Sequence, residues 1–512
     1  MSIKPLMHLL LFLLYGVLAI VIAVVVAYAS GLRSHGELAP WHTVRLDREF
    51  VAGGSGDTRT LDDYRRIEDA VFAQLSREVY GAVEPSLQRV ANRYAAGSRA
   101  DPNRAPTNWN KTFELSADPA RGAALLLHGM SDSPYSLRAI GEDLNGLGFQ
   151  VLGLRLPGHG TTPAGLVHAD WQDFAAATRL GARYLRARLP PDRPLYIVGY
   201  SNGAALAVEY ALARLQGEDL PEPQGLILLS PAIGVSPVAA LATWQSRLSR
   251  LPGLGVLGWT SLAPEYDPYK YQSFAVNAGV QVHALTQVID RRMTQLAAAG
   301  RTAEIPPILA FQSIADATVS APALVRVLFN RLQGASSQLV AFDVNRHAEV
   351  DALFLPDAAP GVEPLLHQSM LPFDLTLLTN ASSRSSAIVS LRRRPGAGDP
   401  ARTETDLVWP VGMFSLSHVA VPFAPDDPVY GANRPEEPEL LYLGRMEALG
   451  EKGLLAVPAA DLFRLRFNPF FPYVRQRIRE FVAAGAPHGP PAVVAPMPKP
   501  PASVSSDSRP AR

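Results

Sequence analysis

The sequence predicts an α/β fold in which a mostly parallel central sheet is covered by helices on both faces. Apolar runs of the length of buried strands recur along the chain, at residues 123–127, 151–156, 195–198, 225–229, 307–312 and 339–343. Helical stretches separate the first four runs, around residues 135–146, 171–189 and 203–216. Short buried strands that alternate with helices indicate parallel strands with both faces covered.

The N-terminus carries an apolar segment that is set apart from the rest of the chain. No residue from Leu9 to Ala29 is charged, and a helix of that length spans about 30 Å of hydrocarbon. Ala27-Tyr28-Ala29 also fits the small-x-small pattern of a cleaved secretory signal, but such signals usually have a shorter apolar core. We therefore expect residues 1–30 to form an uncleaved, single-pass transmembrane anchor that leaves the main domain outside the cytoplasm, with the cleaved signal as the alternative.

Four further features divide the chain. Residues 31–120 form an N-terminal extension, and residues 121–485 form the main α/β domain. The strand–helix rhythm of that domain breaks at about 235–305 and again at about 346–405, which predicts two insertions. The first would lie over the carboxyl ends of the strands, where ligands bind in open α/β sheets, so we expect it to be a cap. Residues 486–512 are proline-rich and are predicted to be disordered.

Composition limits the classes of function. Lys+Arg and Asp+Glu are both 47, so the net charge is zero and nothing favours a nucleic-acid partner. Cysteine is absent, which excludes thiolate nucleophiles, disulfides and cysteine-based zinc sites. Residues 253–258 match G-x-G-x-x-G, but they follow a proline instead of a strand, so a dinucleotide site is not indicated. We expect neither a cofactor nor a metal.

The pentapeptide Gly199-Tyr200-Ser201-Asn202-Gly203 is the strongest functional signal. It follows the apolar run 195–198 and opens a helical stretch, which is the setting of a nucleophile elbow. A sharp turn there would lift the Ser201 hydroxyl off the sheet. The flanking glycines are needed because a side chain at either position would crowd the neighbouring strand or helix. The alternative is an ordinary serine that caps the following helix.

Three further segments stand out: His128-Gly129-Met130-Ser131-Asp132-Ser133-Pro134, Leu154-Arg155-Leu156-Pro157-Gly158-His159-Gly160-Thr161-Thr162-Pro163, and Trp171-Gln172-Asp173-Phe174. They resemble the α/β-hydrolase superfamily, most closely its carboxylesterases, monoglyceride lipases and serine aminopeptidases. The resemblance covers roughly residues 120–345 and a piece near 410–485, and it implies the α/β-hydrolase fold. It also implies that His159 shapes its loop and stands outside the catalytic residues.

The same resemblance implies an oxyanion hole made of two backbone amides. Such hydrolases take one amide from the loop after the first of these strands and the other from the residue after the nucleophile. Here those are the backbone N–H groups of Met130 and Asn202, so the two side chains carry no catalytic requirement. Donors aimed at the developing oxyanion are worth roughly 3–4 kcal/mol each.

The acid and the base complete the expected triad. Asp316 follows the run 307–312, where similar hydrolases carry the triad acid, although a loop aspartate that makes its own turn is the alternative. Two histidines compete for the base. His347 has the separation from Asp316 of a compact hydrolase, but charged neighbours make it a solvated surface group. We assign His418, because Ser417-His418-Val419 looks like the segment that ends this type of esterase, and residues 346–405 would then loop out.

The sequence therefore predicts a membrane-anchored serine hydrolase that cleaves carboxylic esters through an acyl-enzyme, with Ser201 as nucleophile, His418 as base and Asp316 as its orienting acid. We expect a small or lipid-like acyl ester as substrate, because an aromatic cap and a membrane anchor suit such molecules. A serine peptidase and an acyltransferase are alternatives on the same fold. A catalytically silent binding protein tethered to the membrane is the alternative from another class.

Overall fold

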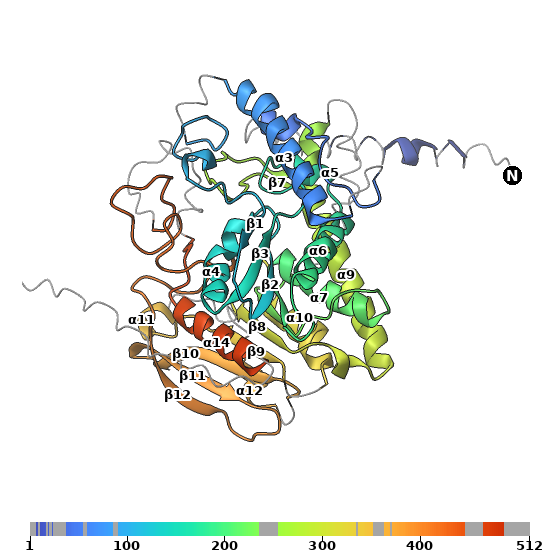
Figure 1. The fold of residues 1–512 in the computed structure, drawn as a ribbon. Coiled ribbons are helices and arrows are strands. Elements are labelled where there is room, and N and C mark those ends of the chain that lie inside the picture. The colour runs from blue at the N-terminus through green and yellow to red at the C-terminus, as the bar shows by residue number, and fades with distance from the viewer. Residues whose placement is uncertain are drawn as a thin grey trace, which may run out of the picture.

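A ten-stranded sheet runs through the part of the chain that the structure describes (Figure 1). The computed structural model describes residues 37–54, 59–84, 91–234, 254–333, 336–351, 363–368, 371–445 and 464–485, with short pieces between residues 7 and 23. In spatial order the strands are β1 (Phe113–Leu115), β3 (Phe149–Leu154), β2 (Gly122–Leu127), β4 (Leu195–Tyr200), β5 (Gly225–Leu229), β8 (Ile308–Ser313), β9 (Gln338–Phe342), β10 (Asp374–Ser382), β11 (Ser385–Arg393) and β12 (Ala401–Val408).

Seven neighbouring strands of this sheet, from β3 across to β10, are parallel. β1 is antiparallel to β3 at one edge, and β11 and β12 continue the other edge in antiparallel pairs. The prediction of a mostly parallel sheet is confirmed. Because side chains alternate along a strand, Leu125 and Leu127 of β2 enter one core, whereas Ala124 and Leu126 enter a second core on the opposite face.

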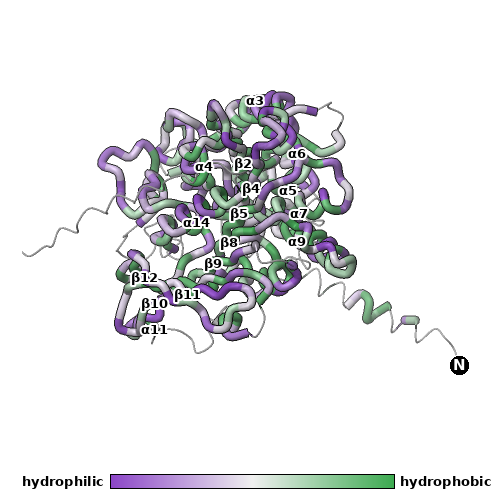
Figure 2. The backbone as a smooth tube through the Cα atoms, turned by 60° about the horizontal axis from the view of Figure 1, so that its bottom comes forward, coloured by the Kyte–Doolittle hydropathy of each residue, from purple (hydrophilic) through white to green (hydrophobic). Residues whose placement is uncertain are grey.

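Helices cover both faces of the sheet, as predicted (Figure 1). Those that contribute to the first core include α6, α7, α9 and α10, whereas α4 and α14 pack on the second core. The described helices are α2 (Pro40–Thr43), α3 (Leu61–Glu78), α4 (Arg138–Gly146), α5 (Gly165–His168), α6 (Trp171–Ala187), α7 (Asn202–Leu215), α9 (Val276–Ala298), α10 (Ala321–Val327), α11 (Ala348–Asp351), α12 (Glu363–Leu366) and α14 (Phe471–Ala484). In Figure 2 the central strands are hydrophobic and the hydrophilic residues gather in the outer loops.

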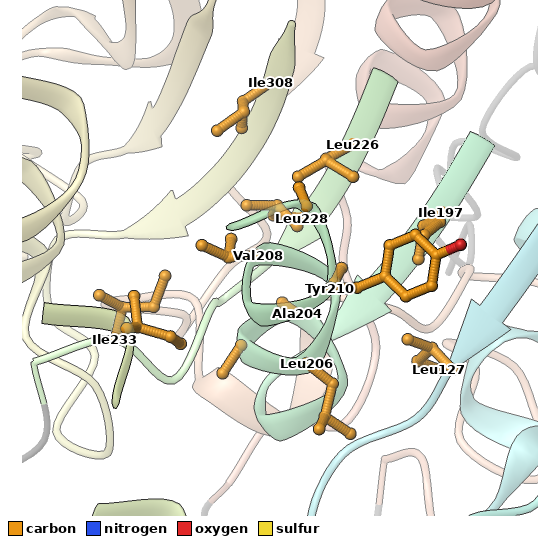
Figure 3. Packing of buried hydrophobic residues seen from close by; sticks show 14 of the residues in the cluster. Leu127, Ile197, Ala204, Leu206, Val208, Tyr210, Leu226, Leu228, Ile233 and Ile308 are labelled. Atoms are coloured by element: carbon orange, nitrogen blue, oxygen red, sulfur yellow. The ribbon is translucent and has the colours of Figure 1, made fainter. Parts of the chain in front are cut away.

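Helix α7 is held at the centre of the first core (Figure 3). Its side chains are almost all buried, including Leu206, Val208 and Tyr210. They pack against Ile197 of β4 and against Leu226 of β5, among others. A helix that is apolar on every side is stable only when it is enclosed in this way. The first residues of α7 are therefore held in a fixed position.

The N-terminal extension is joined to the main domain by a buried ion cluster. Arg155, which follows β3, is fully buried and pairs with Glu49 at 2.9 Å and Glu68 at 3.2 Å. The Tyr64 hydroxyl donates to the Arg155 carbonyl oxygen at 2.6 Å, and Glu49 also accepts from the Gly158 N–H at 2.9 Å. A buried cation needs such partners, because an unpaired charge in the interior is costly. Residues before the sheet thus fix the loop after β3.

The two predicted insertions are described in part. From residue 254 the first contains a short hairpin, β6 (Trp259–Ser261) and β7 (Phe274–Ala275), followed by α9. Leu285, Ile289 and Met293 of α9 enter the first core, so this helix belongs to the layer on the sheet. The second contains β10 and β11, which widen the sheet beyond β9. Residues 235–253, 352–362 and the predicted disordered tail, 486–512, lie outside the described residues.

The predicted transmembrane anchor is wrong, and the extracytoplasmic placement that depended on it is withdrawn. No helix among the described residues is long and apolar enough to cross a membrane. Most of residues 1–30 lie outside the described residues, and the longest described helical piece there runs only over residues 11–16. A spanning helix needs about 20 consecutive apolar residues, which that piece does not provide. Apolar composition over the required length was the whole basis of the prediction.

Candidate active site

Ser201 lies in a sharp turn between β4 and α7. Its φ is 53° and its ψ is −115°, a conformation that non-glycine residues rarely adopt and that costs about 1–3 kcal/mol. The turn is held by the Ser201 N–H, which donates to the Leu229 carbonyl at 2.9 Å, and by the Ser201 carbonyl, which accepts from the Ala204 N–H at 3.1 Å. The Ser201 side chain makes no capping hydrogen bond to α7. The Ser201 hydroxyl therefore does not cap α7.

Glycine is required on both sides of this turn. A Cβ on Gly199 would lie 2.4 Å from the Gly203 carbonyl oxygen, and one on Gly203 would lie 2.0 Å from the Leu127 carbonyl oxygen. A Cβ on Gly129, in the loop after β2, would lie 3.0 Å from the Tyr200 ring. The first two distances are too short for any side chain, and the third would require the Tyr200 ring to shift. The close approach of strand, loop and helix is what makes the elbow possible.

The structure brings Ser201, His418 and Asp316 together in one chain of hydrogen bonds. His418 Nε2 is 3.1 Å from Ser201 Oγ, and His418 Nδ1 is 2.7 Å from Asp316 Oδ2. All three side chains are buried or nearly so, with 9% of Ser201 and 6% of His418 exposed. The histidine can therefore remove a proton from the serine hydroxyl while the carboxylate holds its other nitrogen.

Asp316 is held as a carboxylate by its neighbours. Its Oδ1 accepts from the backbone N–H groups of Thr318 at 2.8 Å and Val319 at 3.0 Å, and its Oδ2 also accepts from Gln312 Nε2 at 3.1 Å. Burial alone would raise the pKa of Asp316. The hydrogen bond and charge of His418, with the two amides, outweigh it and leave that pKa below its ordinary value. The ionised group fixes the imidazole tautomer with the proton on Nδ1.

His418 reaches the site because the chain returns after the widened part of the sheet. It begins a short 3-10 turn, His418–Ala420, after β12. The Ser417 hydroxyl donates to the Leu465 carbonyl at 2.5 Å, and the Tyr200 hydroxyl donates to the His418 carbonyl at 3.4 Å. His347 lies in the loop after β9, where its N–H donates to Asn345 Oδ1 at 3.1 Å. No hydrogen bond joins His347 to Ser201 or Asp316, both of which the structure describes.

Two backbone amides beside the nucleophile are available for an oxyanion. Asn202 is the first residue of α7, where N–H groups have no partner within the helix. Met130 follows Gly129, whose Cβ position lies 3.2 Å from Ser201 Cβ, so its loop lies against the elbow. Within the described part of the chain neither the Met130 N–H nor the Asn202 N–H donates a backbone hydrogen bond. Both amides were named from the sequence, and their role as an oxyanion hole stays a prediction.

Two residues of this region were not assigned a role from the sequence. Buried His128 donates from Nδ1 to the Gly129 carbonyl at 2.9 Å and accepts at Nε2 from the Leu156 N–H at 3.0 Å, which ties the two loops together. Burial and the nearby His159 lower the pKa of His128 well below its ordinary value, so it is neutral. Gln312, which donates to Asp316, is the other. The one sequence signal for a role of Gln312 is its position near the end of β8, four residues before Asp316.

A pocket of about 210 Å³ adjoins the elbow. It is lined by Ser131, Lys270, Tyr271, Gln272, Phe274, Val419, Phe423, Tyr430, Arg464 and Arg466. Ser131 directly follows Met130, and Val419 directly follows His418, so two walls of the pocket continue from the site itself. Within the described residues no group of three or more His, Asp or Glu side chains could hold a metal ion.

Comparison with known proteins identifies a hydrolase family over part of the chain. Residues 118–350 match the family described as serine aminopeptidase, S33. A thermostable monoacylglycerol lipase from Bacillus sp. (strain H-257) is 23% identical over 223 residues, which are 44% of this chain and 81% of that lipase. Over the residues that these matches cover, the chain is an α/β-hydrolase enzyme of the esterase/lipase type.

Solved structures of similar proteins include lipolytic enzymes. One belongs to the metagenome-derived lipolytic enzymes LipS and LipT, at 22% identity and a TM-score of 0.37, with 46% of this hydrolase and 87% of that chain aligned. The monoacylglycerol lipase of Paleococcus ferrophilus aligns at 22% identity and a TM-score of 0.35, over 45% of this hydrolase and 88% of the lipase. These TM-scores are low. Membership of the superfamily therefore rests on the family match, the sheet and the elbow.

Proposed function

We propose that this α/β-hydrolase cleaves carboxylic esters with a Ser201–His418–Asp316 triad, through an acyl-enzyme. The observation that carries the proposal is the continuous hydrogen-bonded path from Ser201 Oγ through the imidazole to the Asp316 carboxylate. A nucleophile, a base within reach of it and a group that orients the base are the parts that acyl transfer requires.

The reaction follows from this geometry. His418 Nε2 takes the Ser201 proton as Oγ attacks the ester carbonyl, and the carbonyl oxygen becomes an oxyanion that the Met130 and Asn202 amides stabilise. The tetrahedral intermediate then expels the alcohol, which takes the proton from His418. Water attacks the acyl-enzyme in the same way, with His418 again as base, and releases the carboxylic acid and free Ser201. Asp316 stabilises the imidazolium in both steps.

A lipid-like acyl ester is the substrate class that we favour, because the lipase relatives in the comparisons include monoacylglycerol lipases. The first insertion would act as a cap over the site. In support, the Tyr271 N–H donates to the Ser131 carbonyl at 2.8 Å, and the Lys270 ammonium lies 6.0 Å from the centre of the Tyr200 ring. Residues of this segment therefore border both the elbow and the loop of Met130.

A peptide or amide substrate is the second candidate, since the matched family is described as a serine aminopeptidase. We expect the purified protein to hydrolyse p-nitrophenyl butyrate and a monoacylglycerol, and to release p-nitroaniline from aminoacyl-p-nitroanilides far more slowly. The release of p-nitrophenol under pre-steady-state conditions would show a burst if deacylation limits turnover. Faster cleavage of the anilides than of either ester would replace the esterase proposal by the peptidase one.

Asp316→Asn is expected to lower kcat for p-nitrophenyl butyrate by about 10⁴-fold. The amide Nδ2 would donate to His418 Nδ1, so the imidazole would carry its proton on Nε2, facing Ser201. The carboxamide oxygen can still accept from the Thr318 and Val319 amides, and the fold should survive. The measurement is kcat together with the thermal unfolding midpoint. A loss of less than tenfold in a folded variant would argue against Asp316 as the orienting group.

A further inference from the structure

The pocket beside the elbow is lined by four segments that are distant in sequence. Residues 270–274 form one wall and are joined to the loop of Ser131 by the Tyr271 N–H. Residues 464–466 form another wall, which the Ser417–Leu465 hydrogen bond ties to the segment of His418. The Asn468 N–H donates to the Phe423 carbonyl at 2.8 Å and holds the same two segments together. The pocket is thus built on the parts that position the base.

Cationic side chains outnumber the acids around this pocket. Lys270 Nζ lies 3.6 Å from Asp132 Oδ2, a loose pair. Arg466 is held more closely, because Nη1 is 3.0 Å from Asp267 Oδ2 and Nη2 donates to the Tyr266 hydroxyl at 2.9 Å.

Arg464 is the third cation. It is exposed and has no hydrogen bond or ion pair among the described residues. Three cations thus face two paired carboxylates, and the charge that is left over is on Arg464.

The other titratable groups nearby do not cancel this charge. Burial raises the pKa of Asp132 to about 6, although Lys270 opposes the rise. Glu265 lies behind Gln272 and accepts from the backbone N–H groups of Gln272 and Ser273. Burial raises the pKa of Glu265 to about 7. Among the described residues these acids are held by their own partners, which leaves the Arg464 guanidinium without a described counter-ion.

We propose that this pocket binds an anionic group of the ester substrate, a carboxylate or a phosphate, with Arg464 as the residue that contacts it. This inference rests on the proposed function. The volume of about 210 Å³ is below the roughly 300–1,000 Å³ of a complete small-molecule site, so the pocket takes a compact group and not a whole acyl chain. Because Ser131 and Val419 adjoin the oxyanion amide and the base, the negative charge lies close to the scissile ester. A guanidinium binds such oxyanions through paired hydrogen bonds.

Two pairs of esters test the proposal with the full-length protein. 4-Acetoxybenzoate and its methyl ester differ in the charge of the alcohol part, and mono-p-nitrophenyl succinate and its methyl ester differ in the charge of the acyl part. The intrinsic reactivities within a pair differ. The quantity measured is therefore the anionic-to-neutral ratio of kcat/KM in each variant relative to the wild type.

In at least one pair, Arg464→Ala is expected to lower this ratio by about tenfold, the size of one charge-assisted hydrogen bond. Arg464→Glu should lower it further. In the wild type the ratio should fall as salt is added, because an exposed charge is screened. The pair that responds identifies the side of the ester that carries the charge.

Arg384→Ala is the matched control. Arg384 is an exposed arginine in the turn between β10 and β11, and its removal changes the net charge equally without altering the ratio. A ratio that Arg464→Ala leaves unchanged in both pairs would overturn the anionic pocket while ester hydrolysis itself stands. Failure of the wild type to hydrolyse any of the four esters would instead overturn the proposed function, and this inference with it.

Discussion

Replacement of Ser201 by alanine is expected to lower kcat for p-nitrophenyl butyrate by about 10⁶-fold, the loss seen when a triad nucleophile is removed. The variant keeps the oxyanion amides and the substrate pocket but has no atom that can form the acyl-enzyme. Ser201 Oγ makes its hydrogen bond to His418 alone among the described residues, so the fold should not depend on it. The thermal unfolding midpoint should stay close to that of the wild type.

Ser230→Ala is the matched control for Ser201→Ala. Ser230 is a fully buried serine that also has a positive φ, of 44°, and it directly follows the neighbouring strand β5. Its hydroxyl has no hydrogen-bond partner among the described residues. We expect this variant to keep wild-type activity. Retention of more than a hundredth of wild-type kcat by folded Ser201→Ala would exclude Ser201 as the nucleophile.

Replacement of His418 by alanine is expected to cause a loss of similar size, about 10⁶-fold in kcat. Without the imidazole the Ser201 proton has no acceptor, and the leaving alcohol has no donor. His347→Ala is the paired experiment, because His347 is the histidine that the compact spacing favours. It should retain wild-type kcat, since no hydrogen bond joins it to Ser201 or Asp316 among the described residues.

Both histidine variants would be assayed with the same short ester across pH 5–9, with unfolding midpoints as the check on folding. An inactive His347→Ala together with an active His418→Ala would refute the assignment. The comparison is decisive because only one of the two imidazoles lies within 3.1 Å of the serine hydroxyl.

The elbow could be predicted from sequence because its determinants are local. The glycines at 199 and 203 are required by backbone atoms a few residues away or on the adjacent strand, and the apolar runs on either side define a strand and a helix. The position of Asp316 was predictable for the same reason, since it lies three residues past the end of β8.

The separation from Asp316 along the chain could not decide which histidine is the base. The chain makes β10, β11 and β12 between β9 and His418, and how those strands lengthen the sheet is a matter of tertiary pairing. The Ser417-His418-Val419 segment resembles the segment that ends this type of esterase, and this resemblance favoured His418 in spite of the spacing.

Contacts between segments that are distant along the chain could not be predicted from the sequence. The buried cluster of Arg155, Glu49 and Glu68 unites residues from the extension and the main domain, and nothing in the local pattern pairs them. The cations of the pocket come from positions 270, 464 and 466, which only the fold brings together. The membrane anchor failed for the opposite reason. Length and hydropathy describe a segment in isolation, and no described helix meets both criteria.

The identity of the nucleophile is tested most directly by covalent labelling. A fluorophosphonate probe reacts with a serine only when a base and an oxyanion site activate it, and peptide mapping by mass spectrometry locates the adduct. We predict a single adduct on the peptide that contains Ser201, which disappears in Ser201→Ala and is retained in Ser230→Ala. Absence of labelling in folded wild-type protein, or an adduct on another serine, would contradict the account.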